Sequence, residues 1–177
     1  MKKLITICLL VVTLLVGGMT MDAKTTKKKS KGSSSKQSSS VFANFTYDGN
    51  SWGLKKNGDV VSKMHNGKYG EAGKYVEDNS GYILVFGSGD TPEELAIIYK
   101  DTLYYLGFTG EIGNVDTYDE INFYFASNLY SDRNCIKNVI TFNPNTESIR
   151  FKSNQGWKEL YLSNVPAKDR YKVTWTK

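Results

Sequence analysis

The chain contains one histidine, His65, and two cysteines, Cys8 and Cys135, so the chemistries that depend on these residues are restricted. A zinc hydrolase needs a set of nitrogen or sulfur ligands that one histidine cannot supply. Cys135 with His65 would be the only pairing of a thiol nucleophile with a histidine base, and neither residue lies in a sequence typical of cysteine proteases. We interpret Cys135 as an unreactive cysteine at a strand start and His65 as a surface residue.

Motifs for binding phosphates are also lacking. The stretch GSGDT at 87–91 has neither the lysine of a P-loop nor the glycine spacing of a dinucleotide site. No spacing nominates a pair of catalytic carboxylates, although glycan hydrolysis depends on a separation in space that a sequence does not reveal. We predict no cofactor and no metal site, and we favour binding over catalysis without excluding an enzyme.

No apolar run is long enough to span a bilayer comfortably, so no membrane span is predicted. The run from Leu4 to Val16 covers 13 residues, follows two lysines and precedes small residues up to Ala23. This combination is typical of a cleaved signal peptide. We therefore predict a signal peptide over residues 1–23 and export to the periplasm, the cell surface or the medium.

Residues 24–40 carry six lysines and no apolar side chain, which predicts a disordered lysine- and serine-rich linker. This segment explains the basic pI near 9.0, because residues 41–177 have a net charge of −2. The folded part thus offers no reason to predict nucleic-acid binding. The linker could make weak electrostatic contact with anionic surfaces. Removal of the signal peptide would leave Cys135 alone and exclude an intramolecular disulfide.

Residues 41–177 are expected to form a single globular domain, large enough to bury a core. The first strand is predicted at Val41–Tyr47, and Asn57-Gly58 predicts a hairpin with a two-residue turn in which Leu54 faces Val61. Residues 63–73 are interpreted as a loop. Segments 74–77 and 82–86 are predicted to pair across 78–81, with the uninterrupted apolar stretch 82–86 buried on both faces.

The segment WGLKKNGDVV, from Trp52 to Val61, resembles the core of a WG repeat, a tryptophan-glycine module with a turn and a valine pair. The resemblance covers about ten residues in a single copy. Repeat architectures need several units to bury their apolar faces. The resemblance therefore implies neither that family's fold nor its function for this chain.

A helix is predicted at the centre of the chain, between Thr91 and Gly107. Thr91 followed by Pro92 and Glu94 is a capping-box pattern with proline at the first helical position, and Gly107 can end a helix. The residues that would share its apolar face are Leu95, Ile98, Tyr99, Thr102, Tyr105 and Leu106. The alternative is a pair of strands over 96–99 and 102–106, because isoleucine and tyrosine favour strands.

The rest of the chain is interpreted as strands and turns. A weak strand is predicted at 111–117 and an alternating strand at 121–127, and further strands are predicted at 136–142, 147–152, 157–162 and 171–176. Their period-two pattern assigns these residues to the core: Ile149, Phe151, Leu160, Leu162, Tyr171, Val173 and Trp175. We expect an α+β domain with a mainly antiparallel sheet, built from two N-terminal hairpins and a C-terminal meander, with one central helix.

That alternation directs a mixed set of aromatic and basic side chains away from the core: Tyr124, Arg150, Lys152, Trp157, Tyr161 and Lys172. Flat rings beside cations suit glycans, acidic polymers or protein partners. We predict a ligand site at the first five of these residues. The other interpretation is that the helix or the N-terminal hairpins cover this face and the side chains only complete the packing.

The predicted function is that of an exported bacterial envelope protein that binds a glycan, an acidic polymer or a protein partner non-covalently. The alternatives are a carboxylate-dependent glycan hydrolase and a purely structural envelope protein. A pocket with two or three convergent carboxylates would favour the enzyme, and a flat aromatic patch would favour binding.

Overall fold

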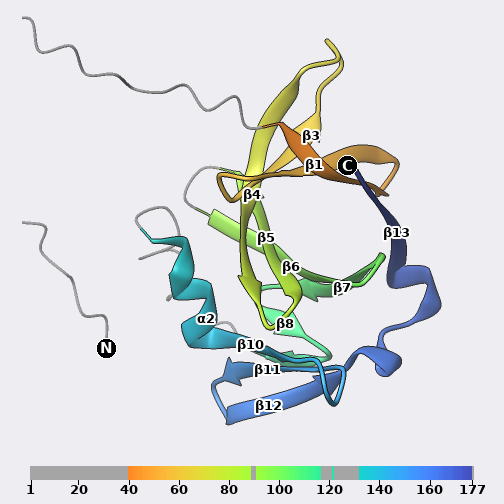
Figure 1. Cartoon of the computed structure of the whole chain (residues 1–177). Coiled ribbons are helices and arrows are strands. Elements are labelled where there is room, and N and C mark those ends of the chain that lie inside the picture. Colours follow the sequence, from red (N-terminus) through yellow and green to blue (C-terminus); the bar gives the residue numbers. More distant parts are fainter. Residues whose placement is uncertain (1–39, 89–90, 117–120, 122–131, 177) are drawn as a thin grey trace, which may run out of the picture. The chain divides into compact units, whose positions relative to one another are not determined.

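The computed structural model describes residues 40–88, 91–116, 121 and 132–176. Eight antiparallel strands form a closed barrel, in which β1 to β7 follow one another and β13 closes the wall between β7 and β1 (Figure 1). The barrel strands are β1 (Val41–Tyr47), β2 (Asn50–Lys55), β3 (Asp59–Lys63), β4 (Tyr69–Asp78), β5 (Gly81–Ser88), β6 (Thr91–Tyr99), β7 (Thr102–Phe108) and β13 (Arg170–Trp175). In the described part of the chain, no helix is long and apolar enough to cross a membrane.

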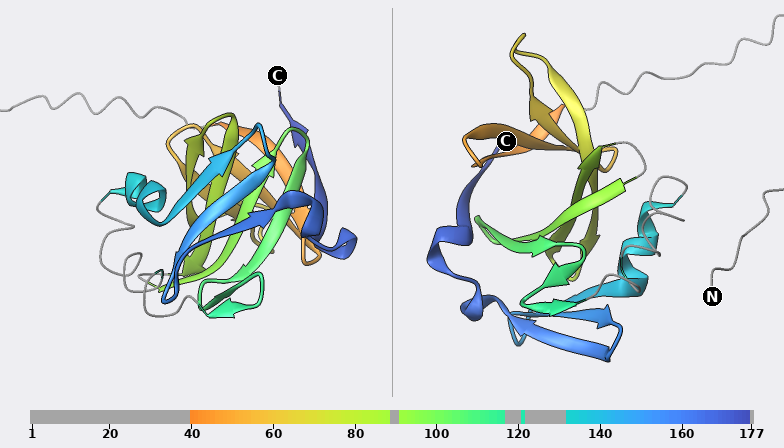
Figure 2. Two further views of the ribbon diagram at one scale, coloured as in Figure 1. Left: turned by 90° about the horizontal axis from the view of Figure 1, so that it is seen from below. Right: turned by 180° about the vertical axis from the view of Figure 1, so that it is seen from behind.

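The segment between β7 and β13 lies outside the barrel. It contains the hairpin β8 (Glu111–Ile112) and β9 (Val115–Asp116), the 3-10 turn η2 (Arg133–Cys135), the helix α2 (Ile136–Val139), the strands β10 (Ile140–Asn143), β11 (Ser148–Ser153) and β12 (Gly156–Tyr161), and the 3-10 turns η3 (Leu162–Asn164) and η4 (Ala167–Asp169). Strands β10, β11 and β12 form a separate sheet that lies across one side of the barrel wall (Figure 2).

The predicted α+β fold with a central helix is wrong, because the segment from Thr91 to Phe108 is the hairpin β6–β7. The alternative pair of strands is therefore correct. The chain reverses at Lys100 and Asp101, where Lys100 has a positive φ of 54°. Among the described residues, α2 is the only α-helix, and it has four residues.

The wrong prediction has a physical cause: β5 and β6 are buried on both faces. Ile83, Val85, Leu95 and Ile97 belong to an outer core, which lies between the barrel wall and the β10–β12 sheet. The residues that alternate with these four point into the barrel; they are Leu84, Phe86, Ala96 and Ile98. Together with Leu54, Val60 and Leu103 they belong to an inner core. A strand buried on both faces loses its period-two pattern.

The supposed helix signals have other roles. Pro92 lies opposite Gly87 near the start of β6, where the register shifts and a missing donor is tolerated. A second register shift lies between β6 and β7, where Leu95 pairs with Gly107 while Ala96 pairs with Tyr105, so that Leu106 is an extra residue. Gly107 directly follows this extra residue. Its φ of 117° suits a β-bulge in which glycine is favoured. Start and stop signals for helices overlap with those for bulged strands.

The hairpin at Asn57-Gly58 is confirmed, but its predicted register is wrong by one residue. Leu54 faces Val60, and the Gly58 N–H donates to Lys55 O at 3.0 Å, so the loop has three residues. Gly58 has a positive φ of 95°, which fits a bulged three-residue loop. The predicted loop at 63–73 is also too long, because β4 already begins at Tyr69.

The last four strands lie close to their predicted positions in the sequence, but the predicted C-terminal meander is wrong, because β10–β12 form a separate sheet and β13 closes the barrel. Ile149 and Phe151 are buried in the outer core, while Val173 is buried inside the barrel with Tyr171 and Trp175 packed against the inner core. The predicted strand at 136–142 is wrong in its first half, since residues 136–139 form α2. The strand predicted at 121–127 lies outside the described residues, apart from Ile121, which is buried.

Candidate binding surfaces

The outer face of the β10–β12 sheet carries four of the five predicted site residues. In the antiparallel pairing of β11 with β12, Lys152 lies opposite Trp157 and Ser148 opposite Tyr161. Trp157 and Tyr161 are 46% and 44% exposed. We call Arg150, Lys152, Trp157 and Tyr161 the aromatic strip.

The rings of the strip are set among charged groups. The Arg150 guanidinium lies 5.6 Å from the centroid of the Trp157 ring, a cation–π distance. Glu159 stands between Trp157 and Tyr161 on β12, and its Oε1 accepts a hydrogen bond from Ser148 Oγ at 2.5 Å. Trp157 and Tyr161 are four residues apart on β12, which places their Cα atoms about 13 Å apart. The strip is thus an open surface with a ring at either end and two cations beside them.

The other predicted outward residues are not part of this surface. Tyr124 lies outside the described residues. Lys172 is exposed on β13, where it lines a shallow depression on the barrel wall with Arg170 and Tyr69. Nothing in the geometry tests whether the four residues of the strip bind a ligand, and that role stays a prediction.

A second group of aromatic residues closes one end of the barrel, and the sequence did not identify it as a site. Tyr47 is at its centre, with ring centroids 5.2 Å from those of Tyr105 and Tyr171, 5.9 Å from Phe86 and 6.0 Å from Trp52. The other end of the barrel is filled by a similar group: Phe42, Tyr75, Tyr82 and Trp175. Both ends of the barrel interior are therefore aromatic.

A carboxylate is built into the first of these ends. The Tyr47 hydroxyl donates to Glu94 Oε2 at 3.1 Å, and the hydroxyls of Tyr47 and Tyr105 also share a hydrogen bond. Burial, together with the negative charges of Glu93 and Asp48, raises the pKa of Glu94, and the hydrogen bond from Tyr47 opposes this shift. Burial also raises the pKa of Tyr47 well above its ordinary value.

A pocket of about 320 Å³ opens beside these groups. Its lining combines aromatic rings with acidic residues: Tyr47, Trp52, Phe86, Asp48, Glu71, Glu93 and Glu94, with Ala72 and Gly87. We call it the barrel-end pocket. No group of three or more potential metal ligands occurs among the described residues, so the carboxylates are not gathered around one point.

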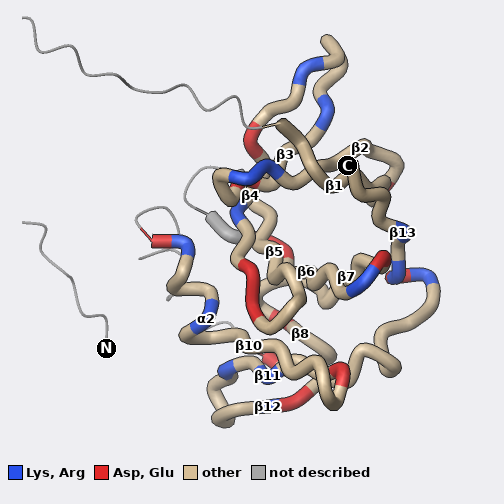
Figure 3. Tube along the Cα trace, in the orientation of Figure 1, with Lys and Arg blue, Asp and Glu red and all other residues tan. Residues whose placement is uncertain are grey.

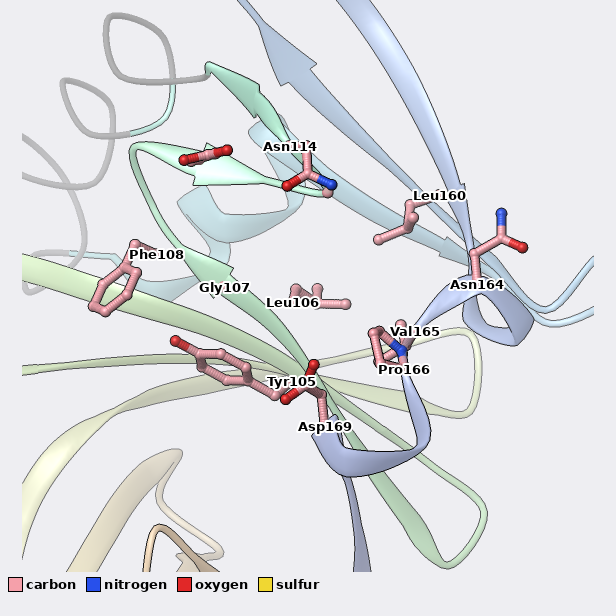
Figure 4. Close-up of a pocket in the computed structure, with 12 residues that line it drawn as sticks. Tyr105, Leu106, Gly107, Phe108, Asn114, Leu160, Asn164, Val165, Pro166 and Asp169 are labelled. Atoms are coloured by element: carbon pink, nitrogen blue, oxygen red, sulfur yellow. The ribbon is translucent and has the colours of Figure 1, made fainter.

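A larger pocket, of about 570 Å³, lies behind β12 between β7, β8 and the η3–η4 segment (Figure 4). Leu106, Leu160 and Val165 form its apolar part, and Tyr105 and Asp169 lie together at one side. Tyr105 therefore contributes both to this pocket and to the aromatic end of the barrel. Leu160 and Tyr161 are neighbours in β12, so the pocket and the strip lie on opposite faces of that strand.

Cys135 and His65 are placed far apart in the fold. His65 is exposed between β3 and β4, whereas Cys135 is buried in the outer core, in η2 and not at the predicted strand start. Burial raises the pKa of the Cys135 thiol to about 11, which keeps it protonated at neutral pH. The two side chains do not form a nucleophile–base pair.

Charge does not segregate strongly on the described chain, since positions of both signs are distributed over the barrel and the outer sheet (Figure 3). The barrel-end pocket is the acidic exception, and the strip carries two cations, with the Glu159 carboxylate between its two rings. Comparisons of the chain with protein-family models, curated proteins and solved structures found no match.

Proposed function

We propose that this chain is an exported protein that binds an anionic glycan non-covalently through the aromatic strip. Export is supported by the two lysines and the apolar run from Leu4 to Val16. The observation that carries the binding proposal is the exposure of Trp157 and Tyr161 on one sheet face, with the Arg150 guanidinium stacked against Trp157.

The chemistry of the strip matches that of an acidic sugar chain. Aromatic rings stack on the apolar faces of sugars and lose little conformational entropy on binding. Two rings on residues whose Cα atoms are about 13 Å apart along one strand suit an extended ligand of several sugar units. Arg150 and Lys152 can pair with carboxylate or sulfate groups of that ligand, Arg150 with two parallel hydrogen bonds.

The test is isothermal titration of the protein with polygalacturonate as the acidic glycan and dextran as the neutral one. Replacing Trp157 or Tyr161 with alanine should each weaken binding to the acidic glycan by about thirtyfold, the typical cost of losing a central aromatic anchor. The double variant Arg150→Ala and Lys152→Ala should lose the preference for the acidic glycan and the salt dependence of binding.

Phe108→Ala is the matched control, because Phe108 is an aromatic side chain with 62% exposure outside the strip. It should bind as the wild type does. Equal weakening by Phe108→Ala, or unchanged binding in both strip variants, would contradict the proposal. The alternative of a carboxylate-dependent hydrolase would be favoured if the protein releases new reducing ends from a glycan and Glu94→Gln abolishes this release.

A further inference from the structure

We propose that the barrel-end pocket binds a small organic cation with an alkylammonium group. Three aromatic rings form part of its lining, and the carboxylates of Asp48, Glu93 and Glu94 lie around them. This site is separate from the aromatic strip and selects ligands of the opposite charge. It does not depend on the proposed glycan function.

The rings carry the first part of the argument. Tyr47, Trp52 and Phe86 contact one another with centroid distances of 5.2 to 6.0 Å, and all three line the pocket. Aromatic faces attract cations through their quadrupoles, and tryptophan is the strongest of them. A cluster of rings that borders a cavity recognises quaternary and methylated ammonium groups, because it offers both apolar contact and a negative surface.

The charges select the kind of ligand. Asp48, Glu93 and Glu94 form no ion pair with any described residue, whereas Glu71 is paired with Lys74 at 2.5 Å. An anionic ligand is therefore disfavoured, and an apolar one would leave these carboxylates without a counter-charge. The carboxylates do not converge as ligands of a metal ion would, which favours a cation whose charge is spread over a larger group.

The pocket is also held in place before any ligand binds. Trp52 Nε1 donates to Tyr47 O at 3.0 Å, and Tyr47 in turn donates to Glu94. Phe86 is fixed within the inner core. Ordered side chains lower the entropy cost of binding. A volume of about 320 Å³ is at the lower end for ligand sites and suits a head group rather than a large molecule.

The experiment is a titration of the whole protein with choline, followed by NMR. We expect saturable shifts of the Trp52 indole N–H, which lies beside the pocket. The uncharged isostere 3,3-dimethylbutan-1-ol should give no saturable shift, because it has the same shape without the charge. Phosphatidylcholine vesicles distinguish a free cation from a lipid head group. If the pocket binds the head group, the wild-type protein should sediment with the vesicles, whereas Glu94→Gln should not. If it binds only a free cation, neither protein should sediment with them.

Variants make the test specific. Glu94→Gln keeps an acceptor for Tyr47 but removes the charge, and it should weaken choline binding by about tenfold. Glu93→Gln should act in the same direction, because Glu93 is exposed and forms no ion pair with any described residue. Glu111→Gln is the control, because it changes the net charge equally and Glu111 lines the larger pocket but not the barrel-end pocket.

Three results would overturn the proposal. The first is the absence of a saturable shift with choline. The second is equal binding of the uncharged isostere, which would make the pocket merely apolar. The third is equal weakening by Glu94→Gln and Glu111→Gln, which would show only a long-range effect of net charge.

Discussion

Single ionisable residues in this protein are tied to the barrel by local contacts, and the pair of Asp59 and Lys74 is the clearest case. Lys74 Nζ lies 2.8 Å from Asp59 Oδ1, across β3 and β4, and both side chains are 18% exposed. Burial alone would raise the pKa of Asp59. The hydrogen bonds from Lys74 and Asn57 and the charge of Lys74 outweigh burial and lower that pKa.

This shift predicts a pH-dependent contribution to stability. Because the pKa of Asp59 is lower in the folded state than in the unfolded one, the stabilisation is present above the ordinary pKa and is lost as the pH falls through the folded value. Asp59→Asn should therefore lower the free energy of unfolding by about 1–2 kcal/mol at pH 7. The difference from the wild type should shrink below about pH 4.

Urea unfolding at a series of pH values measures this difference. Asp48→Asn is the control, since Asp48 is exposed and forms no ion pair with any described residue. A deficit for Asp59→Asn that stays the same at every pH would mean that the ion pair is not its source.

Among the elements, the hairpins show how turn residues set the register of neighbouring strands. In β4–β5, Asp78 pairs with Gly81, and the two turn residues Asn79 and Ser80 have positive φ values of 46° and 69°. This turn also protects the edge of β10. The Phe142 N–H donates to Asp78 Oδ2 at 2.8 Å, and Asn79 Nδ2 donates to Phe142 O at 2.9 Å.

Ser80→Gly should stabilise the protein by roughly 0.5–1 kcal/mol, measured as the free energy of unfolding in urea. Serine is unfavourable in the left-handed conformation, whereas glycine adopts it without a steric penalty, and the gain is reduced by the greater freedom of glycine in the unfolded chain. Ser80→Ala removes the hydroxyl but keeps the Cβ atom. It should give no stabilisation, and an equal gain in both variants would show that the backbone conformation is not the cause.

The β6–β7 hairpin explains why a helix was predicted in its place. Ile97 packs in the outer core and Ile98 in the inner core, so apolar residues of both parities are required. A continuous apolar segment also fits one face of a helix, and the threonine, proline and glycine around it favoured that interpretation. The choice between the two structures depends on layers of structure on both sides of the segment, which local sequence does not describe.

Residues 41–176 combine a closed barrel with an outer sheet, and in the sequence they follow an apolar run and a lysine-rich segment. We predict that the chain recovered from envelope or medium fractions starts near Lys24, as intact-mass analysis would show.

A shortened chain that starts at Val41 should melt within a few degrees of the longer one, because residues 24–40 have no apolar side chain to bury. An abundant full-length intracellular form, or a large drop in melting temperature, would contradict these expectations.

The sequence was sufficient for features that depend on near neighbours. Asn57-Gly58 marks a real hairpin, residues 82–86 form a strand buried on both faces, and the alternation in β12 correctly directs Trp157 and Tyr161 outward. These features follow from turn conformations and from the two-residue period of a strand. Four of the five predicted site residues could therefore be placed on one face before the fold was known.

Closure of the barrel and assembly of the barrel-end pocket could not be derived in this way. Tyr47 and Glu94 are 47 residues apart in sequence, and Trp175 donates to Asp101 from 74 residues away. Each of these residues looks like an ordinary strand or turn position on its own. Only the pairing of β13 with both β1 and β7 brings their side chains together, because strand order is set by contacts between distant segments and not by local preference.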